Sequence, residues 1–166
     1  MARAYLSLGS NIDPEKNLRA AILDLRVQFG TIALSSLYRC PAIGFDGPDF
    51  LNMATIIETT ISPVKLNDWL HALEDRHGRR RDQPRFASRT LDIDIVLYDD
   101  LILRGAGNLE LPRKELEHAF VLCPLAEIAP LVLHPQSRKT LAQLWEEFPQ
   151  ASEPLEMLGR IDSVVA

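Results

Sequence analysis

Apolar and polar residues alternate along four stretches of the chain, with the period of two that is typical of β-strands. Between them, apolar residues recur every three or four positions, as in amphipathic helices. The pattern predicts strands at residues 3–8, 31–39, 50–61 and 89–98, and helices at residues 14–29, 63–77 and 140–148. The order strand–helix–strand–strand–helix–strand indicates a split βαβ plan, with a mostly antiparallel sheet and helices on one face. The opposite face is then expected to be open to ligands or covered by loops.

Turn residues support these boundaries. An Asp-Pro pair at Asp13 and a Ser-Pro pair at Ser62 mark the starts of the first two helices, and a glycine follows each helix. Residues 98–103 are predicted to form an added hairpin, with further helical segments between residues 113 and 148. After about residue 149 the patterning fades, so we expect a mobile tail. The length is that of one domain, spanning residues 1–166.

The strand at residues 89–98 carries an unusual pair of carboxylates. Alternation places the side chains of Asp92 and Asp94 on one face, about 7 Å apart along the backbone. The other face is apolar, with Leu91, Ile93, Ile95 and Leu97. Two carboxylates so placed repel each other, and aspartate is a poor strand residue. A divalent cation would relieve the repulsion, because hard cations prefer carboxylate oxygens.

A run of arginines lies directly before this strand. Its members are Arg76, Arg79, Arg80, Arg81, Arg85 and Arg89. Such a run is most often a solvated face, but arginine also binds phosphate in a planar, bidentate manner. Active sites for phosphoryl transfer combine carboxylates that bind a metal with guanidinium groups that bind phosphate.

Several other positions allow two interpretations. The loop at residues 40–49 carries Ile43 and Phe45, so it either packs on the core or closes over a ligand. Asn52 suits the edge of a heterocycle, or closes a turn, with equal weight. Glu74 is either a boundary residue of its helix or faces a site. The Gly-Ser-Asn turn at residues 9–11 could present N–H groups to phosphate, although a plain strand–helix connection is favoured.

Composition and charge narrow the class of protein. A hydrophobic content of 46% and a charged content of 25% are those of an ordinary globular protein. The net charge of −5 argues against general nucleic-acid binding. No apolar run resembles a signal peptide or approaches the ~20 residues of a membrane span. Cys40 and Cys123 lack a metal or redox spacing and fit a reducing cytosol, so we expect a cytoplasmic protein and no membrane partner.

Six segments in fixed order carry a family resemblance that extends to about residue 148. They are Leu8-Gly9-Ser10-Asn11, Tyr38-Arg39-Cys40-Pro41, Pro48-Asp49-Phe50-Leu51-Asn52, Glu74 with Gly78-Arg79 and Arg81, Arg89-Thr90-Leu91-Asp92-Ile93-Asp94, and Phe120-Val121-Leu122-Cys123-Pro124-Leu125 followed by Glu127 and Pro130. In this combination the chain resembles the 6-hydroxymethyl-7,8-dihydropterin pyrophosphokinases of folate biosynthesis.

The resemblance implies a ferredoxin-like α+β fold with added elements. It implies transfer of the pyrophosphoryl group of ATP to the hydroxymethyl oxygen of the pterin, with release of AMP. Two Mg²⁺ ions are expected on Asp92 and Asp94, and the pterin is expected between Phe50 and Phe120. Its edge would be read by Asn52 and by the loop near Cys40 and Ile43. ATP would meet the residues Glu74, Arg79, Arg81, Phe86, Arg89, Arg113 and His118, of which Arg79 and Arg89 are also expected to be catalytic.

Three positions depart from the family pattern. Arg113 stands where the family usually has a histidine that touches ATP, His118 where it usually has an arginine, and Cys40 where it often has a threonine. A histidine pairs well with phosphate only when protonated, near or below pH 6.5. The departures predict altered ATP affinity without its loss, and they leave open whether Arg113 and His118 compensate each other. The general base also stays open, between an aspartate and metal-bound hydroxide.

Several rival functions remain beside the kinase. A divergent paralogue would bind pterin with altered or weak activity. An RNA-binding module of similar plan would display aromatic side chains where this strand displays aspartates. A metal-dependent phosphohydrolase would not explain Phe50, Asn52 and Phe120 together. We therefore expect ATP and the pterin as small-molecule partners of a monomer, although an oligomer is not excluded.

Overall fold

The computed structural model describes residues 1–78, 82, 88–105 and 109–161. Its main sheet has six strands in the order β5-β1-β4-β3-β8, with β2 beside β4. These strands are β1 (Ala2–Ser10), β2 (Ala33–Leu34), β3 (Leu37–Cys40), β4 (Phe50–Thr59), β5 (Asp92–Tyr98) and β8 (Glu156–Gly159). All of their pairings are antiparallel, which confirms the mostly antiparallel sheet. Among the described residues, the helices are too short or too polar to cross a membrane.

The first strand lies inside the sheet, with a neighbouring strand on each side. Leu8 of β1 pairs with Met53 of β4 on one side and with Ile93 of β5 on the other. Two helices return the chain across one face: α1 (Pro14–Phe29) after β1, and α2 (Pro63–Arg76) after β4. Both begin with the predicted proline, and Gly30 ends α1 with a positive φ of 78° that favours glycine.

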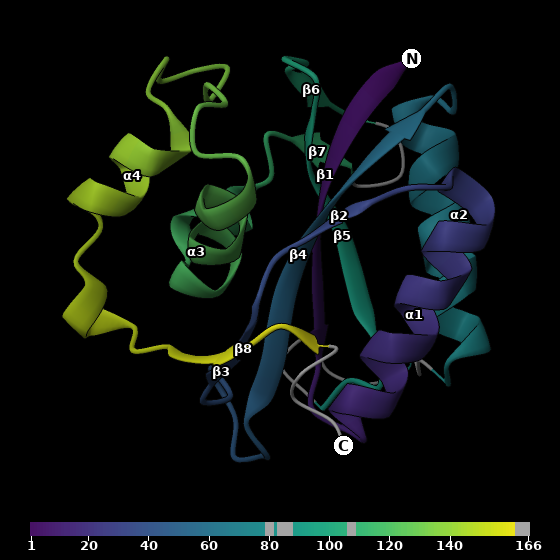
Figure 1. Ribbon diagram of the computed structural model, residues 1–166, viewed down its shortest axis with the longest axis vertical. Coiled ribbons are helices and arrows are strands. Elements are labelled where there is room, and N and C mark those ends of the chain that lie inside the picture. The colour runs from purple at the N-terminus through teal and green to yellow at the C-terminus, as the bar shows by residue number, and fades with distance from the viewer. Residues whose placement is uncertain (79–81, 83–87, 106–108, 162–166) are drawn as a thin grey trace.

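Helices cover both faces of the sheet, which corrects the expectation of helices on one face. Figure 1 shows α1 and α2 on one side, and α3 (Ala119–Ile128) and α4 (Leu141–Glu147) on the other. The short η2 (Lys114–Glu117) leads into α3. Each face has its own apolar core, one beneath α1 and α2 and one beneath α3 and α4. The apolar segment at residues 119–129 supplies the second core, so only part of that face is left for a ligand.

A bulge in β5 corrects the predicted alternation. The register between β1 and β5 shifts between Tyr5 and Leu6, so that Leu97 pairs with Tyr5 and Ile95 with Leu6. Val96 and Leu97 therefore both join the core beneath α3, although Leu97 was expected on the face of Ile95. An extra residue in one strand flips every side chain beyond it. Asp92 and Asp94 precede the bulge and keep the shared face.

Three other elements differ from the sequence pattern. The predicted strand at residues 31–39 is interrupted between β2 and β3. Residues 101–103 do not return along β5; instead β6 (Leu103–Arg104) pairs with β7 (Glu110–Leu111). Residues 150–159, in the segment where the patterning fades, form η3 (Gln150–Ser152) and β8 beside β3. Pairing with the edge strand β3 contributes to holding β8, because Glu156 and Met157 are exposed and only Leu158 packs against the core.

Candidate active site

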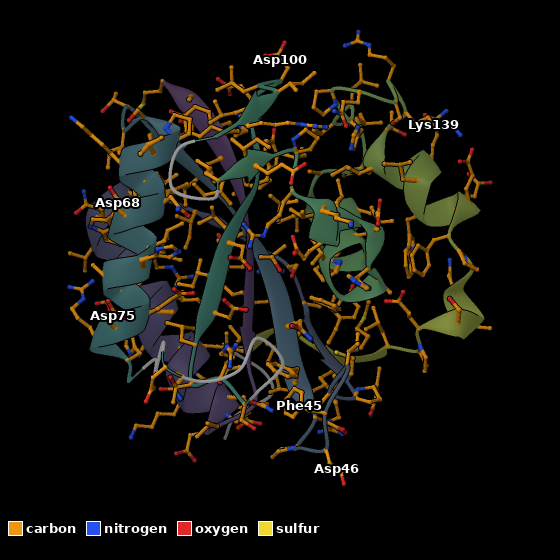
Figure 2. All side chains as sticks on the ribbon, turned by 180° about the vertical axis from the view of Figure 1, so that it is seen from behind. Phe45, Asp46, Asp68, Asp75, Asp100 and Lys139 are labelled. Atoms are coloured by element: carbon orange, nitrogen blue, oxygen red, sulfur yellow. The ribbon has the colours of Figure 1, made fainter. Side chains whose placement is uncertain are left out.

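A cavity of about 510 Å³ opens over the end of the sheet between the two helix layers. Figure 2 looks onto this face, with Asp68 and Asp75 of α2 on one side, Lys139 near α4 on the other, and Phe45 at the lower end. The cavity is lined by Ser7, Gly9, Cys40, Pro41, Ile43, Phe45, Phe50, Asn52, His71, Glu74, Arg89, Asp92, Asp94, Val96, Arg113, Glu115, His118, Phe120 and Val121. Every site residue predicted from the sequence and described by the structure is in this set. Arg79, Arg81 and Phe86 lie outside the described residues.

The two aspartates of β5 stand side by side at this cavity. Asp92 pairs with Gly9 and Asp94 with Ser7 of β1, so small residues flank both. Arg113 Nη2 lies 3.2 Å from Asp94 Oδ1, and Arg113 Nε lies 3.0 Å from Glu115 Oε2. Burial raises the pKa of Asp94 well above its ordinary value, and the Asp92 charge raises it further, while Arg113 lowers it. The pair is therefore electrostatically strained in the absence of a cation.

The carboxylate pair fits a hard cation. Within the described parts of the chain, no group of three or more histidine, cysteine, aspartate or glutamate side chains could hold a metal. Magnesium, however, is commonly bound by one or two carboxylates, with water and substrate phosphates completing its shell. Two oxygen donors that repel each other at the floor of a cavity meet that requirement. Asp92 and Asp94 would therefore hold the metal together with a phosphorylated substrate.

Glu74 belongs to the site, and its position resolves the two interpretations of that residue. The side chain is buried, and Glu74 Oε2 accepts a 2.8 Å hydrogen bond from the backbone N–H of Ile93, between the two aspartates. His71 lies one helical turn before it and also lines the cavity. Glu74 thus ties α2 to the strand that carries the carboxylates. His77, in contrast, lies 3.1 Å from Asp24 of α1 and links the two helices.

Asn11 joins three segments that border the cavity. Its backbone N–H donates to the carbonyl of Arg89 at 3.0 Å, and its side-chain oxygen accepts from the N–H of Arg89 at 2.7 Å. Its side-chain nitrogen donates to the carbonyl of Pro48 and to Ser88 Oγ. Since the Asn11 N–H is engaged within the protein, the structure favours the connecting role of this turn over a phosphate-binding one. Asn11 thereby fixes the backbone of Arg89 beside β5.

The end of the cavity away from the two aspartates is lined by aromatic rings and by the side-chain amide of Asn52. Asn52 Nδ2 donates to Cys40 Sγ at 3.0 Å, and Phe50 and Phe120 line the same cavity. Phe45 packs edge-on against Phe50, with ring centroids 6.4 Å apart. The loop at residues 40–49 therefore packs on Phe50 through Phe45 and lines the cavity with Ile43 and Phe45.

Gly9 determines where the Asn52 amide lies. A Cβ at Gly9 would stand 2.8 Å from Asn52 Oδ1, closer than real contacts allow. We expect Gly9→Ala to displace Asn52 and to raise the Michaelis constant for a ligand bound at that amide by about tenfold, the loss of one or two hydrogen bonds. Steady-state kinetics with each substrate varied in turn checks this. Equal Michaelis constants for wild type and variant would contradict it, and Arg104→Ala, at an exposed position outside the cavity, tests for general effects.

Cys40 is expected to be a poor nucleophile. Burial raises the pKa of its thiol to about 11, against a smaller opposing effect of the Asn52 hydrogen bond. Because only the thiolate reacts, alkylation by iodoacetamide should be slow at pH 7 and should rise about tenfold for each pH unit up to pH 10. Mass spectrometry of peptides containing Cys40 measures this rate separately from that of Cys123. A plateau below pH 9 would contradict the prediction.

His118 lies beside the aromatic wall of the cavity. Its ring stacks on Phe120 with centroids 5.3 Å apart and planes 15° from parallel. Its Nδ1 lies 3.2 Å from Glu153 Oε1. Arg113, the other departure from the family pattern, contacts Asp94 at the carboxylate end. The two departures therefore occupy different ends of the cavity.

Sequence reasoning omitted several residues that line the cavity. The omitted polar ones are Ser7, His71 and Glu115. A signal existed for two of them, because His71 precedes Glu74 by three residues on a helix and Ser7 alternates with Gly9 on a strand. Glu115 gave no such signal, since its place depends on the η2 turn that follows β7.

Solved structures define the class to which this fold belongs. The chain superposes on a crystal structure of Plasmodium falciparum HPPK-DHPS with a TM-score of 0.69 at 14% identity, covering 89% of this chain and 44% of that one. A second crystal structure of that protein gives a TM-score of 0.67, again covering 89% of this chain and 44% of that one. This chain thus spans less than half of those longer chains, and the likeness shows a shared mixed α/β fold.

Sequence comparison identifies the family. The model for 7,8-dihydro-6-hydroxymethylpterin-pyrophosphokinase (HPPK) matches residues 5–130, and the chain belongs to this family. It is 39% identical to the 2-amino-4-hydroxy-6-hydroxymethyldihydropteridine pyrophosphokinase of Synechocystis, over 87% of this chain and 75% of the relative. It is 40% identical to the enzyme of that name from Methylorubrum extorquens, over 87% of this chain and 94% of the relative. The prediction of a pyrophosphokinase of folate biosynthesis is confirmed and is favoured over the divergent paralogue.

Proposed function

We propose that this chain binds ATP and 6-hydroxymethyl-7,8-dihydropterin together in the cavity over β5. It transfers the pyrophosphoryl group of ATP to the hydroxymethyl oxygen and releases AMP. The observation that carries the proposal is that a single cavity joins a carboxylate pair at one end to an amide between aromatic rings at the other. A hydrolase would need only the first end, and a pterin-binding protein only the second.

The pterin occupies the aromatic end. Phe50 and Phe120 sandwich its ring, and the Asn52 amide, held by Gly9 and Cys40, reads its polar edge. Binding between these rings costs the protein little conformational freedom, because Phe50 is on β4 and Phe120 on α3. Its hydroxymethyl group then points along the cavity toward Asp92 and Asp94.

ATP occupies the carboxylate end, with Glu74, Arg89 and Arg113 around it, and Arg79, Arg81 and Phe86 as further contacts predicted from the sequence. Asp92 and Asp94 would hold two Mg²⁺ ions, and ions held there would supply the positive charge that a triphosphate and an attacking hydroxyl need. Arg89 stabilises charge that develops on the transferred group, as arginines do in other phosphoryl transfers. Positioning and charge stabilisation dominate such reactions, so a strong general base is not required.

The finer features predicted from the sequence are consistent with this function. The strand order, in which β4 separates β1 from β3 and β1 separates β4 from β5, supports a ferredoxin-like split βαβ classification. One domain over residues 1–166, a monomeric state and a cytoplasmic location stay predictions.

Product analysis tests the proposed function. Purified protein is incubated with ATP, the pterin and Mg²⁺, and the nucleotides are separated by chromatography. AMP and the pterin diphosphate are expected in equal amounts, and no AMP without the pterin. EDTA should stop the reaction and added Mg²⁺ should restore it. Formation of ADP or free phosphate, or no turnover, would contradict the proposal.

A further inference from the structure

The C-terminal segment at residues 149–161 runs beside the cavity. Figure 1 shows it passing from α4 below α3 to β8, which pairs with β3. Its residues 152–155 form one wall of a second, smaller pocket of about 190 Å³. The opposite wall includes Cys40, Ile43 and Phe120, which also line the main cavity. The segment is therefore part of the surroundings of the proposed pterin site, although nothing in the sequence pattern placed it there.

Glu153 connects this segment to the start of α3. Its Oε1 lies 3.2 Å from His118 Nδ1 and accepts a 3.2 Å hydrogen bond from the backbone N–H of Ala119. Its side chain is 30% exposed, so the contact is only partly screened by water. The same carboxylate is close enough to Cys40 to contribute to raising the pKa of that thiol. Glu153 thus lies between the two elements that carry Phe120 and Cys40.

The orientation of the His118 ring in turn affects Phe120, on which it stacks. A carboxylate at Nδ1 fixes the hydrogen on that nitrogen and so fixes the orientation of the imidazole ring. The ring lies nearly parallel to Phe120 at a centroid distance of 5.3 Å, within the range of favourable aromatic stacking. On the other wall, Phe45 packs against Phe50. Each ring of the proposed sandwich therefore contacts a second ring.

We propose that Glu153 and His118 are positioning residues for the pterin: Glu153 orients His118, and His118 holds Phe120 at the spacing that a flat heterocycle needs. The pair controls affinity for the pterin and leaves affinity for ATP unchanged. This differs from the sequence-based expectation, which placed His118 among the ATP contacts. The inference rests on the proposed function, because it concerns the second substrate of that reaction.

Three variants separate the two roles of His118. Glu153→Ala removes the orienting carboxylate, His118→Ala removes the stacked ring, and His118→Phe keeps a stacked ring that can contact neither phosphate nor Glu153. We expect both alanine variants to raise the Michaelis constant for the pterin by about tenfold, with that for ATP within about twofold of wild type. His118→Phe should raise the Michaelis constant for the pterin by less than His118→Ala, because its ring still stacks on Phe120 but is not oriented by Glu153, and should keep the constant for ATP within about twofold of wild type.

Glu156→Ala is the matched control. Glu156 lies on the same segment, but its partner is the exposed Arg39, away from the cavity. It should leave both Michaelis constants unchanged. If Glu153 only held the segment in place, thermal stability would fall equally in the Glu153 and Glu156 variants without a selective effect on the pterin.

The outcomes distinguish the inference from the function on which it rests. An active wild type whose Glu153→Ala variant keeps its pterin constant, or raises both constants together, overturns the inference alone. A selective rise in the ATP constant for His118→Phe overturns it in favour of a nucleotide contact. A wild type that forms no AMP from ATP and the pterin overturns the proposed function, and the inference with it.

Discussion

Replacing Asp94 by asparagine is expected to lower kcat by about 10³ or more without unfolding the protein. Asparagine keeps the shape of the side chain but removes a charge from the proposed metal pair, and bound metals contribute several kcal/mol of charge stabilisation to such transition states. Steady-state kinetics over a range of Mg²⁺ concentrations measures the loss. The Mg²⁺ concentration needed for half-maximal rate should also rise.

The thermal stability of this variant provides an independent check. Burial and the Asp92 charge raise the pKa of Asp94 in the folded protein, so wild type loses stability as the pH rises from the ordinary pKa of aspartate to that raised pKa. Asp94→Asn should therefore melt at the same temperature as wild type or higher at pH 7. The difference in melting temperature should vanish below the ordinary pKa of aspartate, where Asp94 is protonated in both the folded and the unfolded wild type. Asp100→Asn, at the exposed turn after β5, is the control. Near-normal kcat in Asp94→Asn would exclude a metal role for this residue.

Replacing Arg89 by alanine is expected to lower kcat by roughly 10³–10⁵, the range for arginines that stabilise phosphoryl-transfer transition states. Its backbone is fixed by two hydrogen bonds to Asn11, so the side chain starts from a rigid position at the cavity. Arg89→Lys should recover only a small part of the loss, since an ammonium group lacks the planar fork of guanidinium.

Product formation under single-turnover conditions measures the chemical step directly for these variants. Arg104→Ala is the control, because Arg104 is exposed on β6 and lies outside the cavity. An Arg89→Ala variant with a raised Michaelis constant for ATP but unchanged kcat would contradict a role in the transition state. It would make Arg89 a simple binding residue.

Local patterns were sufficient to predict the parts of the site that depend on one element. Alternation alone placed Asp92 and Asp94 on a common face, since both come before the bulge in β5. The same rule was wrong for Leu97, because a bulge is set by pairing with β1 and leaves no mark in the residues of β5. Proline and glycine signals likewise gave the ends of α1 correctly.

Contacts between distant segments could not be predicted from patterns. Glu153 meets His118 across 35 residues of sequence, and the short β8 that follows Glu153 gives no clear strand alternation. The expected hairpin at residues 101–103 was wrong for a related reason, since β6 has a different partner in β7. The family resemblance supplied Phe50 and Phe120 as a pair, which no local pattern could have brought together.

The position of β1 between two strands has a consequence for how the protein folds. Leu8 is hydrogen-bonded between β4 and β5, and β5 lies far along the chain from it. The first strand therefore cannot be completed on its β5 side until most of the sequence is available. Folding dominated by such distant pairings typically takes milliseconds to seconds. The strand that bears Asp92 and Asp94 forms the edge of the sheet next to β1 and follows β4 in the chain. During synthesis the carboxylate pair is therefore made only after Phe50.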